Sequence, residues 1–198
     1  MMFIASAIAT NSKLTVTRCP YDFLKLELLK LKKMGVEFSF SDHYTSRNKK
    51  TNLVDVTILK SNKLKALSDK IHAQPYPGIN TDNLPFFVPV ALKAKGTTLI
   101  HDWMWENRAI YFTELNRLGA SVRLADPHRV YIEGGEKLSN GELVCPPALR
   151  PSTMLLVTML GIPGRSILRN VYSIKRGYEN IVERLNSIGA EIEEVKEI

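Results

Sequence analysis

Basic side chains that could bind an anionic ligand stand in the loops of this sequence. Arg108 ends the segment DWMWENR, and Lys175 and Arg176 lie in the segment YSIKRGYE, which we expect to be a loop. Arg150 stands just before a predicted helix start in CPPALRPS. A loop ahead of a helix brings side chains and free backbone N–H groups to the positive end of the helix dipole, where anions bind. These residue types in these places predict anion binding.

One carboxylate, Asp82, closes the turn-rich segment PYPGINTD at a predicted helix start. Each of these residues also has a purely structural interpretation. Asp82 could be a helix N-cap, which is the commoner role of aspartate there. Arg150 could pair with a surface carboxylate, Arg108 with the nearby Glu106, and the two tryptophans of DWMWENR could serve in packing. Spacing alone favours the structural role for each residue taken singly.

The elements that must position these residues recur along the chain. Three segments share one order, which is a β-like run, a loop, an amphipathic helix, a glycine and a second β-like run. They span residues 14–40, 97–124 and 165–195. Apolar residues stand seven, four and one positions before each glycine, which places them on one helical face. The sets are Leu28, Leu31 and Met34 before Gly35, Phe112, Leu115 and Leu118 before Gly119, and Val182, Leu185 and Ile188 before Gly189.

Each glycine is expected to end its helix in the left-handed conformation. The alternation after it predicts a half-buried strand, with Ala190 and Ile192 facing inward in the third segment. We expect these helices to pack together inside, with the sheets outside. An apolar stretch precedes each segment and predicts a buried helix; these stretches are MMFIASAIAT, LPFFVPVALKAKG and PSTMLLVTMLGIPG. Further strands are predicted at Asn52–Leu59 and Arg129–Glu133. The basic segment 60–70 is expected to be a surface helix and loop.

The sequence thus predicts one α/β domain over residues 1–198, with three units at about 1–60, 75–134 and 146–198. The first unit begins inside its buried helix, and the third ends before the extra strand of the other two. We therefore expect one strand element to be absent from the array, and a second polypeptide or a longer chain to complete it.

Composition narrows the classes of function. Of 198 residues, 44% are hydrophobic and 24% are charged, which is typical of a globular protein and excludes extensive disorder. The apolar runs are too short to span a membrane. Two cysteines and four histidines without ligand spacing predict no metal site and reduced, cytoplasmic thiols. The net charge of +7 suits an anionic partner, but no basic–aromatic motif supports nucleic-acid binding.

Four motifs carry a resemblance to a known family. PYPGINTD, WENR, ALRPS and SIKRGYENIVERLNSIGA follow, in order and spacing, the second half of UDP-N-acetylglucosamine 1-carboxyvinyltransferases, a family of enolpyruvyl transferases. The similarity runs from about Phe3 to the C-terminus. Enolpyruvylshikimate-phosphate synthases share the repeat architecture but are not expected to show the pattern of PYPGINTD or the ENR of WENR.

The resemblance implies units of the βαβαββ type around a pseudo-threefold axis, with the site in a cleft against a first domain. It implies that Asp82 takes a proton from the 3-hydroxyl of UDP-N-acetylglucosamine, and that Met104 contacts this ligand through its backbone. Arg108, Arg150 and Arg176 would face phosphoenolpyruvate, whose phosphate and carboxylate suit guanidinium forks. No cofactor is implied.

The chain departs from the family pattern at two carboxylates. Ala148 and Lys175 stand where the family usually has aspartate. The catalytic cysteine of the family belongs to its first domain, and neither Cys19 nor Cys145 matches that cysteine. We therefore expect the first domain to be supplied in cis or in trans, and no enolpyruvyl transfer by this chain alone. The alternative is a non-catalytic module that binds ligands or regulates and keeps the fold without the chemistry.

Overall fold

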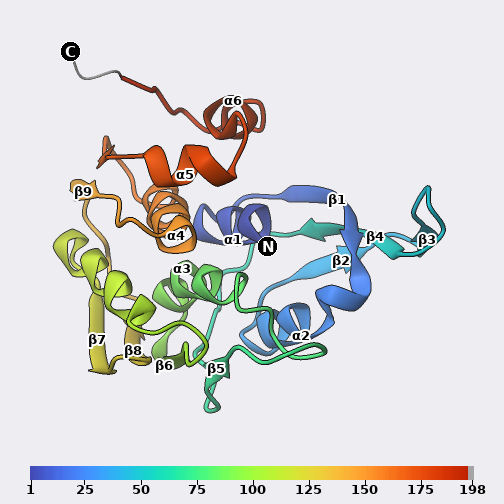
Figure 1. The fold of residues 1–198 in the computed structure, drawn as a ribbon, viewed down its shortest axis with the longest axis horizontal. Helices are drawn as coiled ribbons and strands as arrows, with labels where there is room; N and C mark the ends of the chain where they lie inside the picture. The colour runs from blue at the N-terminus through green and yellow to red at the C-terminus, as the bar shows by residue number, and fades with distance from the viewer. Residues whose placement is uncertain (196–198) are drawn as a thin grey trace.

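The computed structural model describes residues 1–195, whose helices and strands fall into three stretches along the chain (Figure 1). The first stretch contains α1 (Met2–Ala9), β1 (Leu14–Pro20), η1 (Tyr21–Phe23), α2 (Lys25–Lys33), β2 (Phe38–Phe40), β3 (Tyr44–Thr45) and β4 (Asn52–Ile58). The second contains β5 (Ile71–His72), η2 (Leu84–Phe86), α3 (Phe87–Lys93), β6 (Gly96–His101), η3 (Arg108–Leu118), β7 (Ser121–Asp126) and β8 (Arg129–Gly134). The third contains β9 (Glu142–Val144), α4 (Leu149–Leu160), β10 (Ile167–Arg169), α5 (Tyr172–Gly177) and α6 (Ile181–Asn186).

Helices α1, α3 and α4 pack on one another in the middle of the molecule (Figure 1). They arise from the three apolar stretches, so the prediction of three buried helices is confirmed. A helix that is apolar on every side is stable only when it is surrounded by protein. We expected the glycine-ended helices to form this centre, and that expectation was wrong. Those helices have a polar face, so they lie outside the central three and bury one side only.

The buried sides of α2 and η3 match the predicted apolar sets. Leu28, Leu31, Phe112 and Leu115 are all buried in one hydrophobic core with residues of the central helices. Gly119 ends η3 in the left-handed conformation, with φ of +84°. The spacing of apolar residues before a glycine therefore predicted both the buried face and the end of these two helices.

The strands form three separate sheets. In the first, β1 and β2 each pair antiparallel with β4, and the short β3 pairs with β4 as well. The second has the order β5-β6-β8-β7, in which β5 is parallel to β6 and the other pairs are antiparallel. The third consists of β9 and β10, paired in parallel. The predicted strands at 52–59 and 129–133 are confirmed as β4 and β8.

The third stretch departs from the prediction after its helix α6. Ile188 is 48% exposed, and residues 190–195 form no strand, so the expectation of a strand with inward Ala190 and Ile192 was wrong. The physical reason is pairing: β2 and β7 lie against β4 and β8, whereas no described strand is available beside 190–195. Whether the three stretches superpose as repeats stays a prediction, and residues 196–198 of the predicted third unit lie outside the described part.

A side-chain hydrogen bond also recurs between the second and third stretches. Asn116 bonds with its amide to both the N–H and the C=O of Val122, and Asn186 does the same to Ile192. Each asparagine stands three residues before a glycine and fixes the chain that follows it. The equivalent position of the first stretch is Lys32, which has no such amide.

Two further segments differ from their predicted form. Residues 60–70 contain no helix, because their backbone bonds to neighbouring segments through Lys65 N–H to Met34 C=O and Ala66 N–H to Lys95 C=O. Residues 172–177, expected as a loop, form α5. None of the helices in residues 1–195 is long and apolar enough to cross a membrane.

Candidate functional site

The turn Asn80–Asn83 carries the candidate carboxylate between β5 and η2. Asn80 Oδ1 accepts the backbone N–H of Asp82 at 2.8 Å, which is a local side-chain turn. The helix η2 begins at Leu84 with Asn83 as its N-cap, so the interpretation of Asp82 as a helix N-cap was wrong. The Asp82 side chain is 46% exposed and points its Oδ2 at Arg150 Nη2, 2.9 Å away.

Arg150 reaches this turn from the first helical turn of α4. Its Nη1 donates to the hydroxyl oxygen of Tyr178 at 2.7 Å, and its guanidinium carbon lies 5.5 Å from the centre of that ring. Burial alone would lower the pKa of Arg150, but the bonds to Asp82 and Tyr178 hold it above its ordinary value. Burial raises the pKa of Tyr178, so its hydroxyl stays protonated at neutral pH. Arg150 is thus a permanently charged group held by two partners.

Arg108 lies on the other side of the same turn and is buried, with 6% of its surface exposed. Its Nε and Nη2 donate to both oxygens of Asp102, which is itself fully buried. Nη2 also donates to the carbonyl oxygen of Thr81 at 2.8 Å, next to Asp82. The alternative that Arg108 pairs with Glu106 was wrong, because Asp102 takes that place. Of the guanidinium nitrogens of Arg108, only Nη1 has no hydrogen bond to a described residue.

The position of Asp102 is fixed by a backbone hydrogen bond as well as by Arg108. Its N–H donates to the carbonyl oxygen of His128 at 2.7 Å, which ties the segment after β6 to the start of β8. Burial raises the pKa of the Asp102 carboxyl, and the bond to Arg108 opposes that rise. A buried carboxylate is stable only with such hydrogen-bonded partners. The pair therefore fixes the position of Arg108 beside the turn.

Glu27 is the third charged residue that bonds to this turn, and no motif in the sequence selects it. It lies on α2 and is 1% exposed, and its Oε1 accepts the N–H of Asn80 at 3.1 Å and the amide of Asn83 at 2.9 Å. The one available signal is that Glu27 is the sole acidic residue in the basic, apolar helix KLELLKLKK. A lone acid in such a helix is equally typical of a solvated surface position.

The remaining predicted site residues are more exposed. Met104 is an exposed side chain of the 102–108 segment, and Arg176 is exposed on α5 and makes no hydrogen bond or ion pair that the structure describes. Gly177 packs against Leu149 at the start of α4, and the adjacent Arg176 lines a hollow between α4, α5 and α6. The structure thus joins Asp82, Arg108 and Arg150 through one turn, and leaves Met104 and Arg176 apart from this hydrogen-bond network.

The other candidate groups offer no reactive chemistry. Cys19 and Cys145 are buried, and burial raises the pKa of both thiols, so neither is a reactive thiolate at neutral pH. In the part of the chain that the structure describes, no three His, Cys, Asp or Glu side chains lie close enough together to hold a metal ion. The site can therefore offer a half-exposed carboxylate, fixed arginines and a free arginine.

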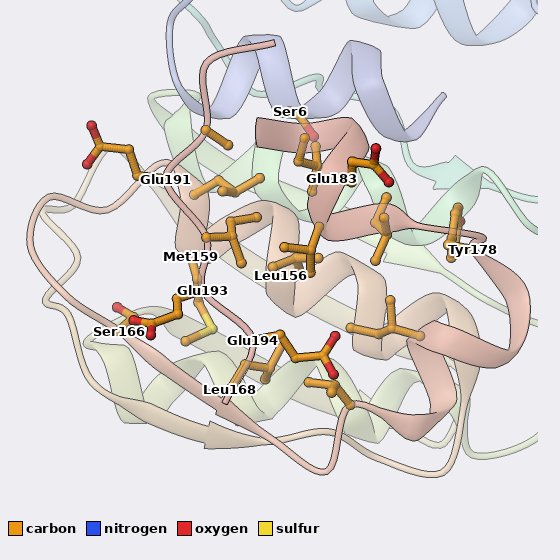
Figure 2. A pocket seen from close by; sticks show the side chains of 18 of the residues that line it. Ser6, Leu156, Met159, Ser166, Leu168, Tyr178, Glu183, Glu191, Glu193 and Glu194 are labelled. Atoms are coloured by element: carbon orange, nitrogen blue, oxygen red, sulfur yellow. The ribbon is translucent and has the colours of Figure 1, made fainter. Parts of the chain in front are cut away.

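A large hollow of about 1860 Å³ lies beside this site, between α4, β10, α5, α6 and residues 188–195 (Figure 2). Its apolar floor includes Leu156, Met159 and Leu168, and its rim includes Glu183 and Glu191. β10 pairs with β9 on one edge, and its other edge has no strand partner in residues 1–195. The hollow is thus an open edge of the fold, distinct from the Asp82 turn.

Comparisons with known proteins agree with this fold. The family model described as EPSP synthase (3-phosphoshikimate 1-carboxyvinyltransferase) matches residues 1–185. The enolpyruvyl transferase NikO from Streptomyces tendae superposes with a TM-score of 0.79 at 26% identity, over 96% of this chain and 42% of that one. An EPSP synthase from Acinetobacter baumannii, at 18% identity and a TM-score of 0.74 over 98% of this chain and 46% of its own, shares the fold. The chain therefore belongs to the enolpyruvyl transferase family, and the predicted α/β fold class is confirmed.

Curated relatives share the name of one branch of the family. The UDP-N-acetylglucosamine 1-carboxyvinyltransferase of Campylobacter jejuni is 31% identical over 98% of this chain and 43% of its own length. That of Treponema denticola is 42% identical over 63% of this chain and 29% of its own. The chain thus spans less than half the length of the curated relatives that it matches.

Proposed function

We propose that this chain is the second half of an enolpyruvyl transferase that acts on UDP-N-acetylglucosamine. The whole enzyme moves the enolpyruvyl group of phosphoenolpyruvate to the 3-hydroxyl of the sugar nucleotide and releases phosphate, in peptidoglycan precursor synthesis. The names of the relatives support the acceptor. The observation that carries the proposal is the Asp82 carboxylate, half exposed and held at 2.9 Å from Arg150 on a turn that other charged residues fix.

Asp82 is the proposed general base. Its carboxylate accepts the proton of the acceptor hydroxyl as the oxygen bonds to C2 of phosphoenolpyruvate, while C3 takes up a proton from a donor in the first half of the enzyme. Loss of phosphate from C2 and of a proton from C3 then restores the double bond. A positioned base contributes about 10²–10⁴-fold in rate. The hydrogen bond from Arg150 Nη2 to Asp82 Oδ2 orients the carboxylate. The backbone of Met104 contributes a contact to the sugar nucleotide.

The arginines are the proposed ligands of phosphoenolpyruvate. Among the described residues, the guanidinium of Arg176 has no hydrogen-bond partner, that of Arg150 is bonded to Tyr178 and Asp82, and that of Arg108 has Nη1 without a hydrogen bond. Arg150 lacks the aspartate that the family usually has at position 148, and its described bonds to Asp82 and Tyr178 serve as its orienting partners. Lys175, the second departure, forms an ion pair with Glu194.

The first half of the enzyme is the proposed partner, joined in cis or in trans. The open edge of β10 and the adjoining hollow support this part of the proposal, because an unpaired strand edge above apolar residues favours covering by further chain. Positioning and electrostatic groups from a facing domain supply several kcal/mol of barrier lowering, so we expect no transfer by this chain alone.

A fusion tests the proposal directly. The first half of the Campylobacter jejuni relative is joined to this chain, and phosphate release from phosphoenolpyruvate is measured with UDP-N-acetylglucosamine, with shikimate 3-phosphate, or with neither. Each half alone is the control, and circular dichroism checks that the fusion is folded. We expect release only from the fusion with the sugar nucleotide. A folded fusion that binds the sugar nucleotide without release would favour a non-catalytic module, and release with shikimate 3-phosphate would contradict the proposed acceptor.

A further inference from the structure

We propose that Glu27 is a positioning residue, which holds the Asp82 turn in place from the first stretch of the chain. This inference rests on the proposed function for its catalytic meaning, while the holding of the turn stands on geometry alone. No motif in the sequence selects Glu27, and it does not face the open side of the site.

The burial of Glu27 demands an explanation. A carboxylate taken out of water is costly unless it is hydrogen-bonded or paired with a cation. No cation lies within ion-pair distance of Glu27 in residues 1–195, so its described partners are the backbone N–H of Asn80 and the side-chain amide of Asn83. Both partners belong to the turn, so both described hydrogen bonds of the carboxylate hold the turn.

A role within its own helix does not explain why Glu27 is buried. Glu27 is the third residue of α2, in the first turn, where an acid interacts favourably with the helix dipole. A solvent-exposed acid would serve the dipole equally well. A glutamate there often bonds back to its own N-cap, yet the described bonds of Glu27 go instead to a segment more than fifty residues away.

Glu27 and Arg108 hold two consecutive residues of the turn, one as a hydrogen-bond acceptor and the other as a donor. Glu27 accepts the N–H of Asn80, and Arg108 donates to the C=O of Thr81, at 3.1 and 2.8 Å. Asp82 follows directly and reaches out to Arg150. The backbone before Asp82 is therefore fixed by an acid of α2 and a base of η3, and the half-exposed Asp82 side chain, bonded to Arg150, is the part of the turn that can meet a ligand.

Two substitutions separate the hydrogen bonds of Glu27 from its charge. Glu27→Gln keeps Oε1 as an acceptor, and Glu27→Leu fills the same space without one. Glu37→Leu, at an exposed glutamate that follows α2, is the matched control, and Asn83→Ala removes one donor in case Glu27→Leu does not fold. Amide hydrogen exchange of this chain reports on the turn, with the strand Gly96–His101 as the internal reference.

We expect Glu27→Leu to speed exchange of the Asn80 and Asp82 amides by at least about tenfold, with β6 unchanged. Glu27→Gln is expected to stay within about threefold of the parent chain. In the active fusion, Glu27→Leu should lower kcat by about 10–100-fold, since small misplacements of catalytic groups cost that much. The KM for phosphoenolpyruvate should change far less, and Glu27→Gln should restore most of kcat.

Unchanged turn exchange in Glu27→Leu and in Asn83→Ala would overturn the inference. Equal damage from Glu27→Gln and Glu27→Leu would overturn it too, because the charge rather than the acceptor would then matter. An inactive parent fusion would count against the proposed function, and the exchange measurements on this chain would still decide whether Glu27 holds the turn.

Discussion

Among single residues, Asp102 and Arg108 matter most for the electrostatic contribution to the stability of the fold. Both are buried, and each is the other's charge partner through two hydrogen bonds. Removal of one member of such a pair leaves an uncompensated charge in a poorly polarisable surrounding, whereas replacement of both by apolar groups can be nearly neutral. The stability of the chain depends on the charge pairing of Asp102 with Arg108, and the position of the turn depends on the bond from Arg108 to Thr81.

Arg108→Met should lower the free energy of unfolding by about 3–5 kcal/mol, because Asp102 then stays buried and unpaired. The double variant Asp102→Leu/Arg108→Met should lose much less. Urea unfolding of the three proteins measures both changes. A double variant as unstable as the single one would mean that the packing of Arg108, rather than its charge pairing, holds this region.

At this scale the sequence predicted part of the site. Asp82, Arg108 and Arg150 stand in recognisable motifs, and the structure joins them through one turn. Glu27 and Asp102 carry no motif, since their roles depend on which distant segment their side chains meet. The N-cap role considered for Asp82 and the Glu106 partner considered for Arg108 were wrong because both relied on nearness in sequence.

Among the elements, two glycines show different reasons for the absence of a side chain. Gly119 ends η3 with φ of +84°, and the nearest atom to an added Cβ would be 4.0 Å away. Gly161 ends α4 with φ of −87°, and an added Cβ would lie 2.4 Å from the carbonyl oxygen of Ala9 at the end of α1. The first position needs a backbone conformation, and the second needs space between two central helices.

These reasons predict opposite orders of substitution. At Gly119, alanine should cost about 1–2 kcal/mol, and asparagine should cost less because it tolerates the left-handed conformation. At Gly161, alanine should cost about 1–3 kcal/mol by overpacking, and the larger asparagine should cost more. Thermal or urea unfolding of the four variants measures the orders. The same order at both glycines would contradict the assignment.

The turn between β7 and β8 predicts a pH effect. Asp126 accepts a side-chain hydrogen bond from Arg129 and backbone bonds from His128 and Arg129, and these lower its pKa below 3.8. A carboxyl whose pKa is lowered by folding stabilises the fold above its unfolded pKa, and loses that contribution as pH falls through the folded value. The stabilisation should therefore be complete at pH 7 and fade below about pH 4.

Asp126→Asn should lower the Tm at pH 7, and the difference from the parent should close as the pH falls well below 4. The Tm of both proteins between pH 7 and pH 2.5 measures this. Asp42→Asn, at an exposed aspartate whose carboxylate makes no described hydrogen bond, is the control and should change little. A constant difference across the pH range would show that the charge of Asp126 does not stabilise the turn.

Most elements could be predicted from local patterns, and the misses have local causes. Apolar spacing before a glycine predicted α2 and η3, and alternation predicted β4 and β8. The helix α5 was missed because YSIKRGYE is short and polar. The strand expected at Ala190 and Ile192 was wrong because alternation describes which face is buried and says nothing of whether a neighbouring strand is present.

On the scale of the whole molecule, the three stretches converge on one turn. α2 contributes Glu27, η3 contributes Arg108 and α4 contributes Arg150, and each bonds directly to residues 80–83. Threefold recurrence in the sequence predicted the class of fold, because each stretch contains an apolar helix that is buried only by packing against the other two. It did not predict this convergence, because residues that meet near the centre are far apart along the chain.

The proposed chemistry rests on the Asp82 carboxylate as the group that takes the proton. Asparagine at this position keeps the shape and an oxygen that accepts a hydrogen bond from Arg150, but it cannot accept the proton of the acceptor hydroxyl. Asn83 rather than Asp82 is the N-cap of η2, so we expect the change to have little effect on folding. A loss of rate would therefore report on chemistry rather than on stability.

The most direct measurement is the rate of sugar-nucleotide-dependent phosphate release by the fusion, compared with its Asp82→Asn variant at equal thermal stability. We expect a fall of about 10²–10⁴-fold in kcat, as is typical for a lost general base, with a much smaller change in affinity for UDP-N-acetylglucosamine. An unchanged kcat with an unchanged melting temperature would contradict the account and leave Asp82 as a structural partner of Arg150.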